Sequence, residues 1–101
     1  MVYHLFMKDI YHVKVPTKVK KSLKKVPLSI ALKLQAWIDA VGNNGLSEVR
    51  KIPGYHDEPL KGKRQGQRSI RLNIAYRAIY SINKDGVISF IEIEEVNKHE
   101  Y

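Results

Sequence analysis

The chain has 101 residues, a length that suits one domain with a single core. Its 18 lysines and arginines outnumber 10 aspartates and glutamates, and the formal charge of +8 favours a polyanionic partner: RNA, DNA, an acidic protein or an anionic membrane. The absence of cysteine excludes disulfides and thiolate metal sites. With no membrane-length apolar run and no secretory signal pattern, the sequence predicts one cytoplasmic domain over residues 1–101.

The first half of the chain predicts a strand followed by two helices. Residues 1–10 are expected to extend the domain, and residues 11–15 alternate as a strand does until Pro16. Thr17 is placed to cap a lysine-rich helix over residues 18–26, whose lysines either contact RNA or form an ordinary solvated face. A second helix starts at Pro27 and stops at a Gly-Asn-Asn-Gly run. Its apolar face consists of Ile30, Leu34, Trp37, Ile38 and Val41.

The second half predicts a loop and three strands. Residues 53–67 are rich in Gly, Pro and cations, and strands are expected over residues 68–73, 76–83 and 87–96. Asp85-Gly86 is a strong hairpin signal. If these two residues are the centre of the turn, one apolar sheet face is made by Ala78, Tyr80, Ile82, Ser89, Ile91 and Ile93. The other face then carries Arg77, Ile79, Ser81, Phe90, Glu92 and Glu94.

The alternation on the preceding strand decides where the arginines point. Ile70 and Leu72 are typical of a core, so Arg71 and Ser69 project to the opposite face. An unpaired cation under the helices would be too costly, and the helices need the apolar face. The predicted fold is therefore α+β, with two N-terminal helices packed on one face of a twisted, mainly antiparallel sheet of about four strands.

The most unusual feature is a run of six cations without an acid from Lys61 to Arg77. Cross-strand Arg–Glu pairs and solvated basic loops are common, and they explain any single cation here. For the whole cluster we favour a polyanion site, in which a glycine-rich loop lets cations approach phosphates. The RNA-backbone contacts expected from this stretch are Lys61, Lys63, Arg64 and Arg68.

Candidate proton carriers lie at the C-terminus and in the loop. His99 and Tyr101 are two residues apart, so an extended chain points both to one side, although terminal residues are often frayed. His56 is a third candidate, with a turn-capping histidine as the ordinary alternative. The four histidines have no metal-ligand spacing, so neither a metal nor another cofactor is predicted.

From about Tyr11 to Tyr101 the sequence resembles the RelE/ParE superfamily of type II toxin–antitoxin toxins. The stretches that carry the resemblance are "PLKGKRQGQRSIRL", "YRAIY" and "EVNKHEY". They are most similar to the HigB-like and plasmid-killer-like ribonuclease branch, whose members have a Leu-Lys-Gly loop leading into a Ser-Ile-Arg strand. The resemblance implies a compact α+β domain, an mRNA endoribonuclease that commonly acts in the ribosomal A site, and a cognate antitoxin protein that blocks it.

The resemblance also implies roles for individual residues. Arg71 and Arg77 match the arginines that steady the scissile phosphate, while Lys98, His99 and Tyr101 match the basic and proton-transferring C-terminal positions. The HigB-like branch typically ends in the order acid, tyrosine, histidine, whereas this chain has His99-Glu100-Tyr101, which leaves the division of roles open.

The sequence thus predicts a metal-independent mRNA interferase that works on the ribosome. Its expected catalytic residues are His99, Tyr101, Arg77, Arg71, Glu94 and His56. Glu92 is an alternative to Glu94, and Lys98 joins the loop cations as an RNA contact. Two other hypotheses remain: a ParE-like toxin that inhibits DNA gyrase without chemistry, and a basic RNA-binding module.

Overall fold

The computed structural model describes residues 9–96. Its helices are α1 (Thr17–Leu23), α2 (Leu28–Asn44) and α3 (Leu46–Val49), with 3-10 turns η2 (Pro53–Tyr55) and η3 (Gly62–Arg64). Its strands are β1 (Val13–Lys14), β2 (Glu58–Pro59), β3 (Gln67–Arg71), β4 (Tyr76–Ile82) and β5 (Ile88–Glu95). The α+β class is confirmed. The sheet has one more strand than predicted, because β2 forms inside the expected loop, and the short helix α3 follows the two predicted helices.

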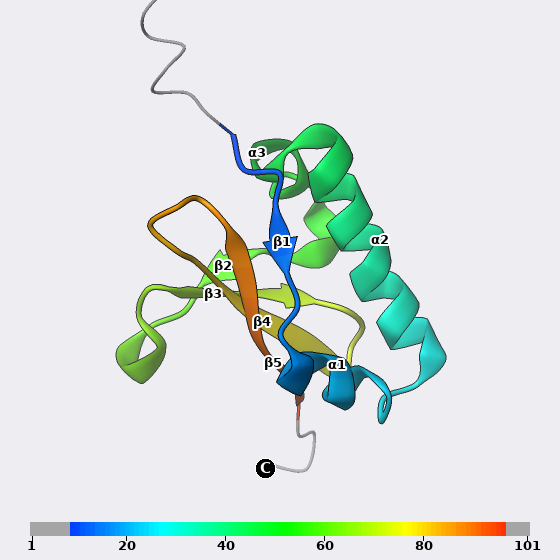
Figure 1. Cartoon of the computed structure of the whole chain (residues 1–101). Helices are drawn as coiled ribbons and strands as arrows, with labels where there is room; N and C mark the ends of the chain where they lie inside the picture. Colours follow the sequence, from blue (N-terminus) through cyan, green and yellow to red (C-terminus); the bar gives the residue numbers. More distant parts are fainter. Residues whose placement is uncertain (1–8, 97–101) are drawn as a thin grey trace, which may run out of the picture.

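The strands make one mixed sheet in the order β1-β5-β4-β3-β2, and α1 and α2 lie together on one side of it (Figure 1). The β2–β3, β3–β4 and β4–β5 pairs are antiparallel, whereas β1 runs parallel to β5. The sheet is therefore mainly antiparallel, as predicted, but its first strand is a parallel edge. Both edge strands are very short, which limits the unpaired backbone that a sheet edge exposes.

Both predicted helices begin close to the predicted positions, but α1 ends at Leu23, three residues before the predicted end at residue 26. α1 starts at Thr17 with Pro16 in the N-cap position, so Thr17 is the first helical residue and its side chain makes no capping hydrogen bond. α2 starts after Pro27 and continues through Asn44, and Gly45 ends it with φ +88°, a conformation that glycine adopts readily. In the described part of the chain, no helix is both long enough and apolar enough to cross a membrane.

The core lies between the helices and the sheet. The predicted apolar face of α2 is confirmed, because Ile30, Leu34, Trp37 and Val41 are buried and Ile38 packs against them. At the centre, the Trp37 ring centroid lies 5.3 Å from that of Tyr80 and 5.4 Å from that of Phe90. These separations are typical of favourable aromatic pairs. The aromatic cluster joins α2 to β4 and β5.

The register of the β4–β5 hairpin differs from the prediction. Asn83 N donates to Val87 O at 3.0 Å, which leaves a loop of three residues, Lys84 to Gly86, with only Gly86 at positive φ. A bulge between Ile79 and Tyr80 then restores the register, so Ala78 faces Ile93 as expected but Tyr80 faces Phe90. Phe90 was predicted on the open face and is instead in the core, 1% exposed.

Candidate active site

The sheet face that the helices leave open carries arginine and glutamate side chains from three adjacent strands. Arg71 pairs with Arg77 across β3 and β4, and Arg77 pairs with Glu94 across β4 and β5. Paired residues of antiparallel strands project to the same face. The predicted clustering of these three side chains on the open face is confirmed.

An ion-pair network crosses this face. The Nε and Nη2 atoms of Arg77 both contact Glu94 Oε1. Arg64 reaches in from the loop, with Nη2 2.8 Å from Glu92 Oε1 and 3.9 Å from Glu94 Oε2, and its Nη1 donates to Gln67. The four charged side chains are about a third exposed, so solvent screening holds each pair to roughly 0–1 kcal/mol. The network orients the arginines more than it stabilises the fold.

Arg71 differs from its neighbour Arg77. It is exposed, and within residues 9–96 no carboxylate lies at ion-pair distance from it, while the residue directly opposite is another arginine. Like charges in directly opposed positions destabilise a sheet. Two adjacent guanidinium groups with only one carboxylate partner are suited to binding an anion, and the planar fork of arginine matches phosphate geometry.

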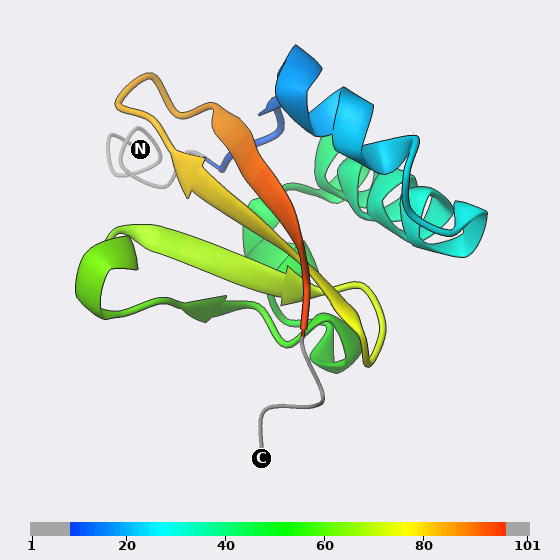
Figure 2. The ribbon, with the colours of Figure 1, turned by 90° about the horizontal axis from the view of Figure 1, so that it is seen from below.

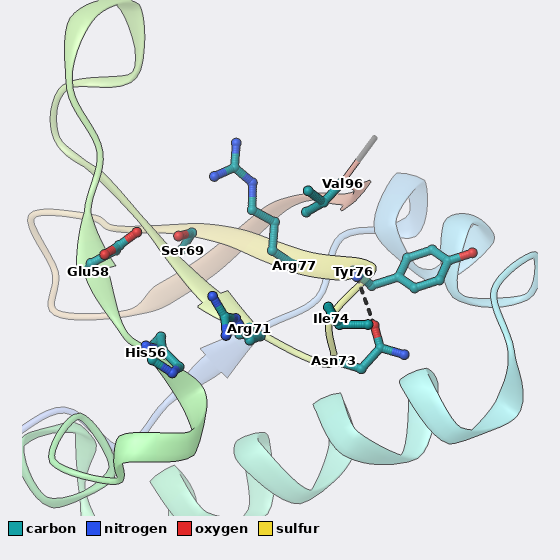
Figure 3. A pocket seen from close by; sticks show the side chains of 9 residues that line it. All are labelled: His56, Glu58, Ser69, Arg71, Asn73, Ile74, Tyr76, Arg77 and Val96. Atoms are coloured by element: carbon teal, nitrogen blue, oxygen red, sulfur yellow. Dashed lines mark hydrogen bonds between the residues drawn. The ribbon is translucent and has the colours of Figure 1, made fainter. Parts of the chain in front are cut away.

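A pocket of about 210 Å³ opens beside these arginines (Figure 3). Arg71 and Arg77 enter it from the sheet, His56 from the segment after η2, and Val96 from the end of β5. The remaining lining residues are Glu58, Ser69, Asn73, Ile74 and Tyr76. The pocket therefore combines two cations, a histidine, a carboxylate and an apolar rim.

The β3–β4 turn forms one wall of the pocket. Asn73 Oδ1 accepts hydrogen bonds from the backbone N of Ala75 at 2.7 Å and of Tyr76 at 2.9 Å. Side-chain acceptors of this kind shape turns. Val96 N donates to Ala75 O at 2.6 Å, which ties the end of β5 to the turn. As a result, the described part of the chain ends at the pocket.

His56 has an unusual backbone conformation. With φ +46° and ψ +49°, it is the one non-glycine residue at positive φ within residues 9–96. Histidine tolerates this left-handed region better than most residues, but it still costs roughly 1–2 kcal/mol. Such strain is more frequent at functional sites than elsewhere.

The loop cations do not gather around the pocket. Lys61 and Lys63 are exposed near η3, which adjoins the first residue of β3, whereas Arg71 is the last residue of β3 (Figure 2). Arg68 pairs with the buried Tyr80 and therefore faces the core side of the sheet, where its Nε lies 2.7 Å from Asp57 Oδ1. Of the predicted loop contacts, the structure links only Arg64 to the arginine–glutamate network.

Three predicted residues, Lys98, His99 and Tyr101, lie outside the described residues. Within residues 9–96, no three His, Asp or Glu side chains gather as metal ligands do. The sequence interpretation missed Glu58, Ser69, Asn73, Ile74, Tyr76 and Val96 as pocket residues. The one available signal was the period-two pattern of β3, which already placed Ser69 beside Arg71 on the open face.

Asp57 and Tyr80 are hydrogen-bonded to each other on the core side of the sheet. The Asp57 side chain is fully buried, and its second oxygen, Oδ2, accepts a hydrogen bond from the Tyr80 hydroxyl at 2.6 Å. Burial, followed by the hydrogen bond to Asp57, raises the pKa of Tyr80 well above its usual value. Tyr80 therefore keeps its proton at all physiological pH values and remains a donor.

Comparison with protein-family models and with curated protein sequences gives no match. Solved structures are similar to this chain along most of its length. The archaeal RelE–RelB complex from Pyrococcus horikoshii OT3 matches with a TM-score of 0.66 and 25% identity, over 87% of this chain and 97% of the matched chain. YafQ from E. coli strain BL21(DE3) matches with a TM-score of 0.66 and 20% identity, over 82% and 90%.

A third similar structure is the YoeB–YefM complex from Staphylococcus aureus, with a TM-score of 0.63 and 17% identity over 85% of this chain and 97% of the matched chain. Nearly the whole length of each matched chain is covered in all three cases. These likenesses confirm the fold that the sequence resemblance implied. They do not separate the HigB-like branch from the others.

Proposed function

We propose that this chain, a RelE/ParE-superfamily protein by its fold, is the toxin of a type II toxin–antitoxin system and a metal-independent mRNA endoribonuclease of the HigB-like branch. Its place of action would be the ribosome in the cytoplasm, and cleavage of mRNA there would stop translation and growth. The observation that carries the proposal is the opposed pair Arg71 and Arg77, which enters one pocket together with His56.

The arginine pair suits the transition state of RNA cleavage. In metal-independent cleavage the substrate's 2′-hydroxyl attacks the adjacent phosphorus, which builds negative charge on the phosphate oxygens. Cationic donors fixed at that position stabilise the charge, and loss of one such donor typically costs about 10²–10³-fold in rate. Arg77 is held by Glu94 and Arg71 borders the same pocket, so little reorganisation is needed when phosphate binds.

Proton transfer requires a base at the 2′-hydroxyl and an acid at the departing 5′-oxygen. His56 is the described pocket residue of the type that most often exchanges protons near neutral pH. His99 is the second candidate, because it follows Val96 by three residues and the chain between them spans at most roughly 11 Å. Tyr101 would share proton transfer or stack on a base. Glu94 would orient Arg77 rather than act as the base.

The cationic surface outside the pocket would bind RNA backbone. Lys61 and Lys63 project from the η3 loop, and Arg64 continues from the loop to the network on the open face. Lys98, which directly precedes His99 in the sequence, would add a further cation. This arrangement is consistent with a substrate strand that runs along β3 from the loop to the pocket, held by charge rather than by base readout.

The proposed partner is an antitoxin. The similar structures include complexes of RelE with RelB and of YoeB with YefM. For this chain, a partner segment with acidic and apolar residues would neutralise the basic open face and exclude RNA from it.

The decisive experiment is induced expression in bacteria followed by primer extension on an abundant message. Wild type is compared with Arg77→Gln and His99→Ala, and with Lys24→Ala as a control cation on the far side of the sheet. The proposal predicts new 5′ ends with wild type and Lys24→Ala, and few or none with Arg77→Gln. Growth arrest with intact message and inhibited gyrase would replace it with a ParE-like mode of action, and absence of arrest would leave an RNA-binding module.

A further inference from the structure

We propose that Asp57, Arg68 and Tyr80 form a buried clamp whose role is to hold His56 in the pocket as a proton carrier. The inference rests on the proposed ribonuclease function and assigns three positioning residues to it. None of the three lines the pocket, so any effect on cleavage would act through the residue that the clamp holds.

The clamp uses both oxygens of a buried carboxylate. Asp57 Oδ1 lies 2.7 Å from Arg68 Nε, and Asp57 Oδ2 accepts from the Tyr80 hydroxyl at 2.6 Å. The Asp57 side chain is 0% exposed and that of Arg68 is 20% exposed. Among residues 9–96, Arg68 is the cation at ion-pair distance from this carboxylate, and a buried carboxylate strongly resists losing such a partner, so the pairing is maintained.

The two partners of Asp57 are themselves fixed by the sheet. Arg68 and Tyr80 are opposed residues of β3 and β4, and the Tyr80 ring packs against Trp37 and Phe90 in the core. Asp57 is therefore attached to the buried core, although it belongs to a segment between η2 and β2. The backbone of a residue next to Asp57 is therefore restrained by the same contacts.

His56 is that neighbour, and its backbone is restrained on both sides. On its N-terminal side, His56 N donates to Pro53 O at 3.1 Å and closes the η2 turn, in which Tyr55 is buried. On its C-terminal side, Asp57 is clamped and Glu58 pairs with Ser69. A residue with a side chain persists at φ +46° only where its surroundings over-determine the backbone. Here the turn and the clamp supply that restraint.

The left-handed conformation has a direct consequence for chemistry. It places the His56 side chain in the pocket that Arg71 and Ser69 also line, as Figure 3 shows. If the clamp opened, the backbone could return to negative φ and the imidazole would leave this position. Misplacement of a proton carrier by about 1 Å can cost on the order of 100-fold in rate, so a bond made outside the pocket can control catalysis within it.

The test is a double-mutant cycle. The measured quantity is the rate at which the protein cleaves a short RNA in the presence of ribosomes. Tyr80→Phe removes one clamp hydroxyl and keeps the ring, and Arg68→Lys is a second variant that keeps the charge. His56→Asn is the partner change, because asparagine tolerates positive φ but transfers no proton at neutral pH. Tyr55→Phe is the matched control, since it removes a hydroxyl from a buried tyrosine beside His56 but outside the clamp.

We expect Tyr80→Phe and Arg68→Lys to lower kcat about 10- to 100-fold with KM changed less than about 3-fold. In the His56→Asn background the same changes should have no further effect, because the positioned group is gone. Tyr55→Phe should behave as wild type. An equal loss of kcat in both backgrounds, or no loss in either, would overturn the clamp as a positioning device.

A second readout separates failure of the clamp from failure of the proposed function. If wild type cleaves no RNA, the ribonuclease proposal fails, and the clamp is then judged by NMR on the free protein. The His56 ring should show nuclear Overhauser contacts to Ser69 or Arg71 protons in wild type that weaken in Tyr80→Phe while core aromatic contacts persist. Unchanged contacts of the His56 ring would contradict the inference.

Discussion

Arg71 and Arg77 lie directly opposite each other on β3 and β4, although both are positively charged. Arg77 is paired with Glu94, and Arg71 has no carboxylate partner among residues 9–96. This arrangement is unfavourable for the free sheet and becomes favourable when an anion joins the two guanidinium groups. It is the relationship on which the proposed phosphate site depends.

Replacement of either arginine should therefore separate stability from activity. Arg71→Gln removes a repulsion, so the free energy of unfolding should stay unchanged or rise by up to about 0.5 kcal/mol, while kcat for RNA cleavage falls about 10²–10³-fold. Arg77→Gln should lower kcat similarly, but its stability should fall below that of Arg71→Gln by up to about 1 kcal/mol, because Glu94 loses its closer partner and keeps only the contact with Arg64 at 3.9 Å. Urea denaturation and single-turnover cleavage measure both quantities; a stability loss in Arg71→Gln would contradict the opposed-charge argument.

The bulged hairpin register makes a stability prediction about two adjacent residues. Phe90→Ala should destabilise the protein by about 3–5 kcal/mol, because it empties the centre of the aromatic cluster. Ile91→Ala, at the bulge and only partly buried, should cost clearly less. Equilibrium unfolding of both variants in urea makes the comparison. If the hairpin had the two-residue turn predicted from Asp85-Gly86, Ile91→Ala would destabilise the protein more than Phe90→Ala.

The loop cations should differ in how they affect RNA binding. Lys61→Ala and Lys63→Ala should each weaken binding and reduce the slope of log K against log salt concentration by roughly 0.7, as expected for one lost contact to single-stranded phosphate. Arg68→Gln, which also removes a charge, should leave this slope unchanged, because Arg68 is hydrogen-bonded to the buried Asp57 and faces away from the open face. Fluorescence anisotropy of a labelled RNA at several salt concentrations gives the slopes. An equal reduction for all three variants would show that Arg68 reaches RNA.

A carboxylate near the beginning of the described chain should make stability depend on pH. Asp9 Oδ1 accepts from Ser47 N at 3.0 Å and Oδ2 from the Ser47 hydroxyl, and these hydrogen bonds lower the pKa of Asp9. The unfolded chain therefore binds this proton at higher pH than the folded chain does. The contribution of Asp9 is complete above about pH 5 and is lost as the pH falls through its depressed folded-state pKa. Asp9→Ala should thus destabilise the protein at pH 6, and this effect should shrink as the pH falls through the lowered pKa of Asp9.

The control for this prediction is a substitution at Gly45, which lies beside the Asp9 carboxylate. A Cβ at Gly45 would meet Asp9 Oδ2, and Gly45 has φ +88°. Gly45→Ala should destabilise the protein at every pH, because backbone strain does not titrate. Thermal unfolding at pH 6 and pH 3 distinguishes the two variants; a pH-independent effect of Asp9→Ala would contradict the assignment.

Several features follow from local periodicity. Strand alternation alone places Arg71 and Arg77 on the face opposite the core, because successive side chains of a strand point to opposite sides. The helical spacing of α2 likewise identifies Ile30, Leu34, Trp37 and Val41 as core residues. Both inferences depend only on neighbouring residues, and the structure bears them out.

The hairpin shows where local patterns are insufficient. The Asp85-Gly86 signal correctly located the reversal of the chain, but not whether the loop has two residues or three. That choice decides whether Phe90 or Ile91 faces the core, and it is made by packing: the Phe90 ring fits against Trp37 and Tyr80, and a bulge accommodates the extra residue. Contacts between α2 and β5 cannot be read from the strand alone.

The sequence by itself determined the charge, the α+β class, the open arginine face and the resemblance to the RelE/ParE superfamily. Only the tertiary structure decided which cations serve that face. Arg68 is hydrogen-bonded to Asp57, 11 residues away, and Asp57 is hydrogen-bonded to Tyr80, 23 residues away. In the sequence Arg68 resembles the neighbouring loop cations, but in the structure it belongs to a buried clamp. The physical reason is desolvation: a buried carboxylate must be paired, and the partner is chosen by position in space, which sequence spacing does not specify.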